Sequence, residues 1–171
     1  MPEPPSFEQW TRSLRDKSTA LDLDTLHPIE RDAIDNAIGF SAEHARRYIA
    51  TEGRDDGWEG PRPILLLYTT GKTSGKQRRN PVLYIDIGNS RFIVASRGGD
   101  SRHPAWYFNL LEEPTVHVRV GAQFYEATAT TIPDSERVDV WPVIVARYPM
   151  FNDYQARIDR TIPVVRVVPE R

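Results

Sequence analysis

Hydrophobic residues in the first third of the chain recur at three- and four-residue steps. Phe7, Trp10 and Leu14 follow this spacing, and so do the apolar residues within 29–49. Such steps place side chains on one face of a helix, so the pattern predicts two amphipathic helices. Pro28 suits the first turn of the second helix, where a missing backbone N–H costs nothing.

The rest of the chain has the spacing of β-strands. After an acidic, glycine-bearing linker, residues 64–70 form a continuous apolar run between a proline and a glycine, which predicts a strand buried on both faces. Further segments separated by short turns predict two hairpins and a final strand. These segments are 82–87 with 91–96, 116–120 with 123–131, and 164–168.

Helices are expected between these strands. Residues 104–113 form a short one, and 134–148 form another whose first turn, Asp-Ser-Glu at 134–136, can cap and charge its start. Pro142 is expected to kink the second helix. Because the hairpins are joined through helices without repeated βαβ units, we predict an α+β protein whose mostly antiparallel sheet curls into a small barrel.

The length of 171 residues fits one barrel domain with an appendage. We expect residues 1–60 to be a helical extension and linker that docks on the barrel, and 61–171 to be the barrel domain. No apolar run approaches the ~20 residues of a membrane-spanning helix, and the start lacks the features of a signal peptide, so a cytoplasmic location is expected. The extension could instead pair two subunits or lie on a membrane surface, which would make the protein peripheral to the membrane, although its acidity disfavours anionic lipid.

Composition excludes several classes of chemistry. The chain has no cysteine, which excludes disulfides, thiolate nucleophiles, cysteine-ligated zinc and iron–sulfur clusters. The four histidines are scattered without metal-ligand spacing, so no metal is expected. The net charge of −2 argues against nucleic acid as a partner.

Positive charge is concentrated in one part of the chain. Residues 1–60 hold 13 acidic and 7 basic side chains, whereas 71–103 hold 7 basic and 2 acidic. The cations of the second region share two glycine-bearing loops, 71–79 and 96–103, and an aromatic segment, 104–109, follows directly. Small residues let a backbone approach a ligand, cations attract anions and aromatic residues offer a flat surface, so we predict a site for an anionic, ring-bearing cofactor.

Each of these features also has a purely structural interpretation. A basic loop can be a solvated hairpin, a glycine pair can form a bulge, and aromatic residues on a short helix can belong to the core. A nucleotide P-loop is excluded, because 71–76 has three residues between its glycines, Gln77 follows the lysine, and the segment joins two strands.

Three aromatic residues near the C-terminus stand at three-residue steps. Tyr148, Phe151 and Tyr154 would share one face of a helix, either as a core stripe or as the wall of a pocket for a planar acceptor. No serine has the setting of a nucleophile, and no carboxylate pair suggests hydrolysis. An enzyme of this sequence would therefore rely on a cofactor.

Several ordered motifs resemble the deazaflavin (coenzyme F420)-dependent nitroreductase and quinone reductase family. The resemblance runs from about Pro63 to Pro169 and leaves residues 1–60 outside it. The motifs are Leu65 to Pro81, Val94-Ala95-Ser96-Arg97-Gly98-Gly99, His103 to Leu110, Asp153-Tyr154-Gln155-Ala156-Arg157 and Asp159-Arg160-Thr161-Ile162-Pro163-Val164.

The resemblance implies a split β-barrel of the FMN-binding type with flanking helices. It implies that reduced F420, a deazaflavin with a phosphate-linked oligoglutamate tail, passes hydride to quinones or nitro compounds. The residues that would hold phosphate and tail are Lys72, Thr73, Ser74, Arg78, Arg79, Asn80 and Pro81. Those around the ring would be Val82, Leu83, Val94, Ala95, Ser96, Arg97, Ala105, Trp106, Tyr107, Phe108 and Asn109.

By the same resemblance, Tyr148 and Tyr154, with Ser96, would be catalytic, and Tyr148, Phe151 and Tyr154 would contact the acceptor. Leu83 and Phe151 stand where family members carry tyrosine, so quinones are the safer acceptor class and nitroaromatics the less secure one. Arg97 stands where lysine is common and keeps the charge with a different geometry.

Other functions agree with parts of this pattern. The protein could be a non-catalytic deazaflavin carrier, or a split-barrel oxidoreductase that uses FMN. A nucleic-acid-binding barrel is the third alternative. The acceptor would be a small molecule, and the sequence leaves open whether the protein forms a homo-oligomer.

Overall fold

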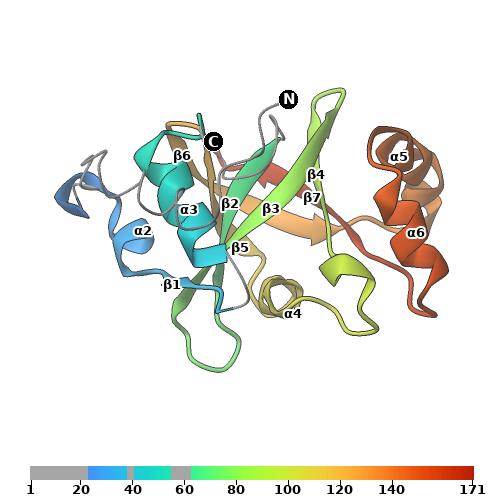
Figure 1. Cartoon of the computed structure of the whole chain (residues 1–171), viewed down its shortest axis with the longest axis horizontal. Helices are drawn as coiled ribbons and strands as arrows, with labels where there is room; N and C mark the ends of the chain where they lie inside the picture. The colour runs from blue at the N-terminus through green and yellow to red at the C-terminus, as the bar shows by residue number, and fades with distance from the viewer. Residues whose placement is uncertain (1–22, 38–40, 55–62) are drawn as a thin grey trace, which may run out of the picture.

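The computed structural model describes residues 23–37, 41–54 and 63–171, and its strands form one sheet (Figure 1). The strands are β1 (Ile34–Asp35), β2 (Ile64–Thr70), β3 (Gln77–Ile87), β4 (Ser90–Val94), β5 (Thr115–Val120), β6 (Gln123–Thr131) and β7 (Val164–Pro169). The helices are η1 (Leu23–Thr25), α2 (Pro28–Asp32), α3 (Ser41–Ala50), η2 (Arg97–Gly99), α4 (Ala105–Glu112), α5 (Asp134–Arg147) and α6 (Met150–Ala156).

Six strands close into a barrel. The sheet order is β1-β3-β2-β5-β6-β7-β4, and β3 also pairs with β4, which closes the ring. Every pair within the ring is antiparallel, whereas β1 pairs with β3 in parallel. The predicted α+β barrel with flanking helices is confirmed, and so are both hairpins and the final strand.

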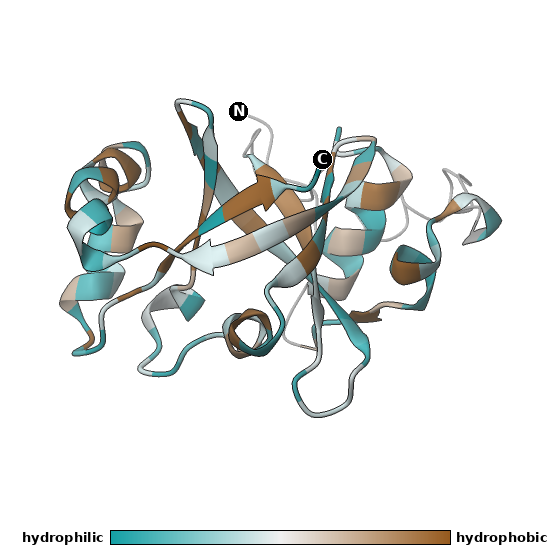
Figure 2. Ribbon diagram, turned by 180° about the vertical axis from the view of Figure 1, so that it is seen from behind, coloured by the Kyte–Doolittle hydropathy of each residue, from teal (hydrophilic) through white to brown (hydrophobic). Residues whose placement is uncertain are grey.

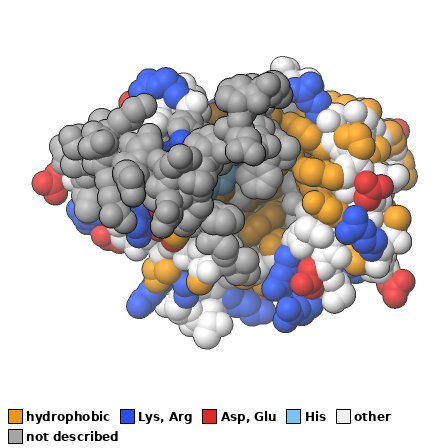
Figure 3. Space-filling view, viewed as in Figure 1, with side chains coloured by type: hydrophobic (Ala, Val, Ile, Leu, Met, Phe, Trp, Pro, Cys, Tyr) orange, Lys and Arg blue, Asp and Glu red, His pale blue; other side chains and the backbone are white. Residues whose placement is uncertain are grey.

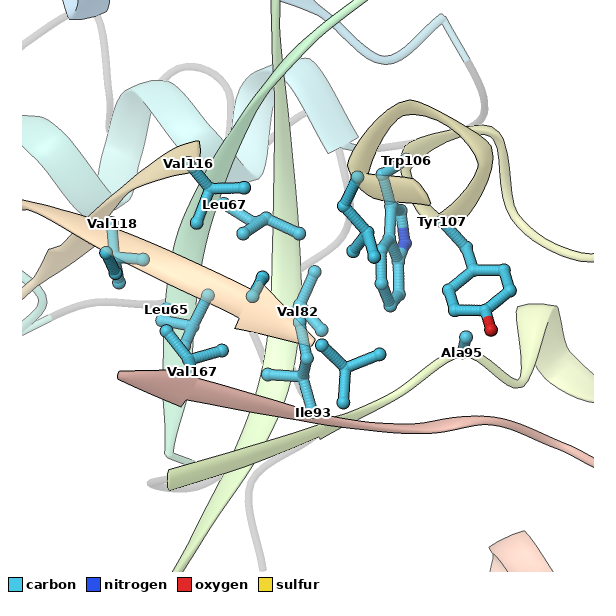
Figure 4. Packing of buried hydrophobic residues seen from close by; sticks show 14 residues of the cluster. Leu65, Leu67, Val82, Ile93, Ala95, Trp106, Tyr107, Val116, Val118 and Val167 are labelled. Atoms are coloured by element: carbon cyan, nitrogen blue, oxygen red, sulfur yellow. The ribbon is translucent and has the colours of Figure 1, made fainter. Parts of the chain in front are cut away.

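Strand β2 is buried on both faces, as its apolar run predicts. Figure 2 shows hydrophobic residues, in brown, along strands of the barrel. Leu65 and Leu67 face the barrel interior, where they pack in one cluster with Val82 and Val118. Figure 4 shows this interior cluster, with Trp106 and Tyr107 reaching into it from α4 toward β4. Helix α4 therefore closes one end of the barrel.

The outer face of the barrel is covered on two sides (Figure 1). Leu66 and Tyr68 of β2 pack against Ala45, Tyr48 and Ile49 of α3. On the other side, α5 and α6 cover β4 and β7 through a second cluster, which includes Phe92, Val94, Ile144, Phe151 and Val164. The described part of the N-terminal region thus packs on the barrel.

The helix predicted over 29–49 is wrong as a single element. Helix α2 begins at Pro28, as expected, but Ala33 ends it in an extended conformation with φ −66° and ψ 140°. The next two residues form β1 alongside Arg78 and Arg79 of β3. The chain thus pairs with the edge of β3 at this point instead of continuing as a helix. The helix predicted around Phe7, Trp10 and Leu14 lies outside the described residues.

Helix α5 differs from its prediction in detail. It runs through Pro142 and ends one residue before Tyr148, which is its C-cap. Asp134 and Glu136 charge the first turn, but the N-cap is Pro133 and no side chain caps the helix. The capping part of the prediction is wrong because the chain enters the helix one residue earlier. Within the described ranges, no helix has the length and apolar character needed to cross a membrane.

Candidate functional site

The β2–β3 loop is a tight turn that presents polar side chains to solvent. The Gly71 N–H donates to the Lys76 carbonyl at 2.7 Å, and the Gly75 N–H donates to the Gly71 carbonyl at 2.8 Å. A Cβ on Gly71 would lie 2.7 Å from Ser74 Oγ and 3.1 Å from the Lys76 carbonyl oxygen, so the absence of a side chain lets the turn close tightly. Lys72, Thr73, Ser74 and Lys76 are exposed on the loop.

Asn109 of α4 holds this loop in place. Its Oδ1 accepts from the Lys72 N–H at 3.0 Å, and its Nδ2 donates to Thr69 Oγ1 at 3.0 Å. Lys72 Nζ also lies 3.1 Å from a Glu112 carboxylate oxygen at the end of α4. The oxygen and the nitrogen of the buried Asn109 amide are thus both hydrogen-bonded within the protein, and these contacts position the loop.

Two of the residues predicted to bind the tail are engaged by the N-terminal segment. Arg79 Nε donates to Asp35 Oδ1 at 2.6 Å, and its Nη1 donates to the Glu30 carbonyl. Asn80 Oδ1 accepts from Asn36 Nδ2 at 2.9 Å. Arg79 is only 6 % exposed, so it does not offer the free cation that the sequence suggested. The sequence alone did not show that β1 would lie beside this strand.

The loop after β4 has an unusual backbone. Ser96 is right-handed, with φ −82° and ψ −34°, and Arg97, Gly98 and Gly99 follow with φ of 49°, 63° and 82°. A right-handed residue followed by a left-handed one turns successive N–H groups toward the same side, which forms a nest for an anion or a carbonyl oxygen. None of the hydrogen bonds found among the described residues uses the Ser96, Arg97 or Gly98 N–H.

Helix α6 contacts this loop directly. A Cβ on Gly99 would lie 3.2 Å from Tyr154 Cβ, so the absence of a side chain lets the loop and the helix approach. The Tyr148 and Phe151 ring centroids are 6.1 Å apart at 85°, and Phe151 and Tyr154 are 6.1 Å apart at 75°. The predicted aromatic row therefore exists, although Tyr148 precedes α6 rather than sharing its helix.

The Tyr148 hydroxyl has no hydrogen-bond partner among the residues that the structure describes. Its Oη is also buried. A buried hydroxyl without a partner costs free energy, and such groups often serve a ligand. Tyr148 packs in the same cluster as Leu83, Val94, Phe151 and Tyr154.

Strand β4 separates the residues predicted to surround the ring. Val94 faces α5 and α6 with Leu83, whereas Ala95 faces the barrel interior with Val82, Trp106 and Tyr107. Trp106 and Tyr107 are each 7 % exposed, and the Tyr107 hydroxyl bonds with Thr131 Oγ1 at 2.9 Å. Trp106 and Tyr107 therefore pack α4 against the barrel, and their rings are not exposed at the surface.

Solvent-exposed cations lie along one edge of the molecule. Figure 3 shows Lys and Arg side chains at its lower edge, where Figure 1 places the β2–β3 loop, α4 and η2. Arg97 is exposed and lies 3.7 Å from a carboxylate oxygen of Asp100. Ala105 and Phe108 are exposed on α4 between the two loops. This edge can attract a polyanion.

His103 lies just before α4, in surroundings that favour its neutral form. Burial lowers its pKa, and the nearby Arg160 guanidinium lowers it further. Its ring centroid is 4.8 Å from that of Tyr107, and its Nδ1 accepts from Arg160 Nη1 at 3.1 Å. No group of metal ligands occurs among the residues that the structure describes.

Sequence reasoning overlooked Arg160 and Gln155 as contributors to the site. Arg160 contacts the loop after β4, and Gln155 Nε2 donates to the Arg160 carbonyl at 2.8 Å. Both lie in the C-terminal motifs that carry the family resemblance, but one sequence does not show which loop they contact.

The chain matches proteins of known families over most of its length. The family model of F420H(2)-dependent quinone reductase matches residues 40–169, which include α3 and so extend beyond the start expected from the sequence. An F420H(2)-dependent quinone reductase of Mycobacterium tuberculosis is 36 % identical over 126 residues, which cover 71 % of this chain and 85 % of the relative.

Solved structures give the same assignment. An F420-H2 dependent reductase is 42 % identical with a TM-score of 0.56, over 62 % of this chain and 94 % of that one. A structure described as a domain-swapped dimer is 38 % identical with a TM-score of 0.58, over 74 % of this chain and 96 % of that one. The chain therefore belongs to the F420H(2)-dependent quinone reductase family, whose members are oxidoreductases with a split-barrel fold.

Proposed function

We propose that this protein reduces quinones at the surface between the loop 96–99 and the aromatic residues Tyr148, Phe151 and Tyr154. The observation that carries this proposal is the close approach of Gly99 to Tyr154, which places the backbone nest beside the aromatic row that continues through Phe151 to Tyr148. An apolar wall and unused hydrogen-bond donors are what a planar, carbonyl-bearing cofactor and acceptor require.

The residues present fit F420. The N–H groups of Ser96, Arg97 and Gly98, which donate to no group among the described residues, suit a ring oxygen. The exposed Lys72, Lys76 and Arg97 suit a phosphate and a row of carboxylates. Arg78 adds a half-buried cation, and Thr73 and Ser74 add hydroxyl donors. Arg79 and Asn80 contribute through the fold instead, because their side chains pair with Asp35 and Asn36.

Reduced F420, when bound, supplies the hydride. The protein has to hold donor and acceptor in contact and exclude water, and Leu83, Val94 and Phe151 provide an apolar wall for this purpose. The Tyr148 hydroxyl is available to donate to a quinone oxygen as negative charge develops there. Tyr154 lies half-buried beside the loop and limits the size of the acceptor.

Quinones fit this wall better than nitroaromatics do. Leu83 and Phe151 offer no hydrogen bonds, so the wall carries fewer donors than one with tyrosine at those positions. A nitro group develops charge on two oxygens and needs several donors, whereas one phenol serves one quinone oxygen at a time.

The test is a fluorescence titration with oxidised F420, and in parallel with FMN, at low and moderate salt. We expect F420 to bind more tightly than FMN and to weaken with salt, because its longer anionic tail engages more cations. Lys76→Gln should weaken binding and reduce the salt dependence, whereas Arg54→Gln, an exposed arginine paired with Glu52 in another part of the chain, should change neither. Preference for FMN, or no binding of F420, would overturn the proposal.

Turnover is tested separately. Oxidation of F420H2 by menadione should be faster than its oxidation by a nitroaromatic of similar size. Tight binding of F420 without menadione reduction would instead identify a carrier.

A further inference from the structure

Arg160 binds the loop after β4 through its guanidinium group. The residue lies between α6 and β7, and its guanidinium donates to four backbone carbonyls and to one imidazole nitrogen. The acceptors are Ala95 O at 3.3 Å, Ser96 O at 2.9 Å, Asp100 O at 3.1 Å, Arg102 O at 3.2 Å and His103 Nδ1 at 3.1 Å. One side chain thus spans the whole loop.

These contacts fix the direction of the nest. A peptide unit is planar and trans, so its N–H points away from its C=O. When Arg160 binds the Ser96 carbonyl, it turns the Arg97 N–H to the opposite side, and binding of the Ala95 carbonyl does the same for the Ser96 N–H. A cation on the carbonyl oxygen also polarises the peptide and makes its N–H a stronger donor.

The loop needs such a restraint. Arg97 has φ 49°, a conformation that residues other than glycine seldom adopt, and the two residues that follow it, Gly98 and Gly99, are conformationally permissive. The backbone–backbone hydrogen bonds within the loop are those of the Gly99 N–H to Ser96 O at 3.0 Å and the Asp100 N–H to Arg97 O at 3.2 Å. Neither of them orients the Ser96 N–H.

Arg160 is itself held by the helix that carries Tyr154. Gln155 Nε2 donates to the Arg160 carbonyl at 2.8 Å, and Gln155 Oε1 accepts from the Ile162 N–H at 2.8 Å. Through these bonds, α6 and the nest keep a fixed relative position.

We propose that Arg160 is a positioning residue that orients and polarises the Ser96 and Arg97 N–H groups toward the cofactor ring. This inference rests on the proposed function, since it concerns the same site. It assigns Arg160 to the ring rather than the tail, because its guanidinium is occupied on the far side of the peptides from the nest.

The inference is tested with Arg160→Ala and Arg160→Lys in the full chain. Both should bind oxidised F420 more weakly than the original protein, by about tenfold or more for Arg160→Ala, as expected for lost charge-assisted hydrogen bonds. The salt dependence of binding should stay unchanged, in contrast to Lys76→Gln, because Arg160 does not contact the anionic tail. A single lysine ammonium cannot reach the Ala95, Ser96, Asp100 and Arg102 carbonyls together, so Arg160→Lys should fold but still bind F420 more weakly than the original protein.

Arg137→Ala is the matched control for packing. Arg137 donates to the Ile162 carbonyl at 3.2 Å and to Gln155 Oε1 at 3.2 Å, so its loss disturbs the same turn without touching the nest. It should lower thermal stability and leave F420 affinity within about twofold. Millimolar guanidinium, far below denaturing concentrations, should partly restore binding in Arg160→Ala but not change it in Arg137→Ala.

Amide NMR gives a readout that does not depend on turnover. In the original protein, the Ser96 and Arg97 N–H signals should shift downfield when F420 binds, and in Arg160→Lys this shift should be reduced.

If the original protein binds F420 and Arg160→Lys binds it equally well with the same amide shifts, the inference is wrong although the proposed function stands. If the original protein does not bind F420, the proposed function fails first. If Arg160→Ala does not fold, the comparison of Arg160→Lys with Arg137→Ala decides.

Discussion

Asp35 and Arg79 form a buried ion pair with 2.6 Å between Oδ1 and Nε, in which the arginine side chain is only 7 % exposed. The pair joins β1 to β3 at the base of the cationic β2–β3 loop, where Asp35 lies opposite Arg79 in the strand register. Beside it, Glu30 binds Arg119 through both carboxylate oxygens at 2.5 and 2.6 Å and accepts from the Tyr68 hydroxyl at 2.8 Å. Buried ion pairs therefore hold the described N-terminal segment on the barrel, in addition to its apolar contacts.

Asp35→Ala should destabilise the protein strongly. The substitution leaves Arg79 as a buried cation without its partner, which costs about 3 kcal/mol of the free energy of unfolding. Urea unfolding measures this loss. Arg46→Ala is the control, because Arg46 lies 3.7 Å from the same carboxylate but is 70 % exposed, and its loss should cost less than about 1 kcal/mol. Equal effects of the two substitutions would contradict the buried-pair account.

Alkaline pH should destabilise the fold through Tyr68. Burial, and then the adjacent Glu30 carboxylate, raise the pKa of this phenol well above its ordinary value of 10.0. The folded state therefore prefers the neutral phenol, and this contribution to stability is complete below pH 10 and is lost as pH rises toward the folded-state pKa, by up to about 1.4 kcal/mol per pH unit.

Tyr68→Phe provides the comparison for that prediction. The variant should be less stable at pH 8, because Glu30 loses a hydrogen-bond donor, but its free energy of unfolding should fall less steeply between about pH 10 and 11. Urea unfolding at several pH values measures both slopes. Parallel slopes in the two proteins would assign the alkaline loss to other tyrosines, such as Tyr48 and Tyr84, whose pKa values burial also raises.

Much of the barrel was predictable because its strands carry their own signals. The apolar run of β2 and the turns of both hairpins are local features, and the structure has each of them where the pattern placed it. Strand β1 was not predictable, because Ile34 and Asp35 pair with a strand more than forty residues away, and a helical spacing in 29–49 concealed this pairing. Tertiary contacts override local preference most easily in such short segments.

The candidate site was predictable as a set of residues but not as a surface. The sequence identified Ser96, Arg97 and the aromatic row, and the structure brings Gly99 against Tyr154. It could not show that Arg79 would be bound by Asp35, or that Val94 and Ala95 would face opposite sides of β4. Neighbouring residues of a strand alternate between faces, and a motif read along the chain does not say which face binds a ligand.

Tyr148→Phe should slow turnover without lowering stability. Its buried hydroxyl has no partner among the described residues, so its removal should leave the free energy of unfolding unchanged or raise it by up to about 1 kcal/mol. The same change removes a donor to the acceptor, and menadione reduction should slow by about tenfold or more.

Tyr48→Phe is a matched control for this tyrosine. The Tyr48 hydroxyl donates to the Ile64 carbonyl at 2.8 Å and accepts from the Gly121 N–H at 2.8 Å, on the opposite side of the barrel. Its removal should cost about 1–3 kcal/mol of stability and leave menadione turnover unchanged. Full menadione turnover in Tyr148→Phe would show that the Tyr148 hydroxyl does not assist the reaction.

His103 should titrate below the ordinary value of 6.5 for histidine. Burial lowers its pKa, and the Arg160 charge lowers it further, so the folded state prefers the neutral ring. This contribution to stability is present above pH 6.5 and is lost as pH falls through the folded-state pKa. In Arg160→Ala the pKa should rise, because one of the two causes is removed. NMR of the ring protons measures it, and His117, whose pKa burial also lowers without Arg160, should titrate unchanged.

Gly99→Ala tests the contact between the nest loop and α6. Gly99 has φ 82°, and a Cβ there would lie 3.2 Å from Tyr154 Cβ and 3.3 Å from its Cα. Gly88, in the β3–β4 turn, has φ 59° with no atom within 4 Å of its Cβ position, so Gly88→Ala carries the backbone strain alone, about 1 kcal/mol. Gly99→Ala should cost about 1–3 kcal/mol more, because the backbone of α6 has to move.

The same displacement separates Tyr154 from the nest, and menadione turnover should fall in Gly99→Ala while it stays unchanged in Gly88→Ala. Equal stability and equal turnover of the two variants would show that this contact does not hold the site together.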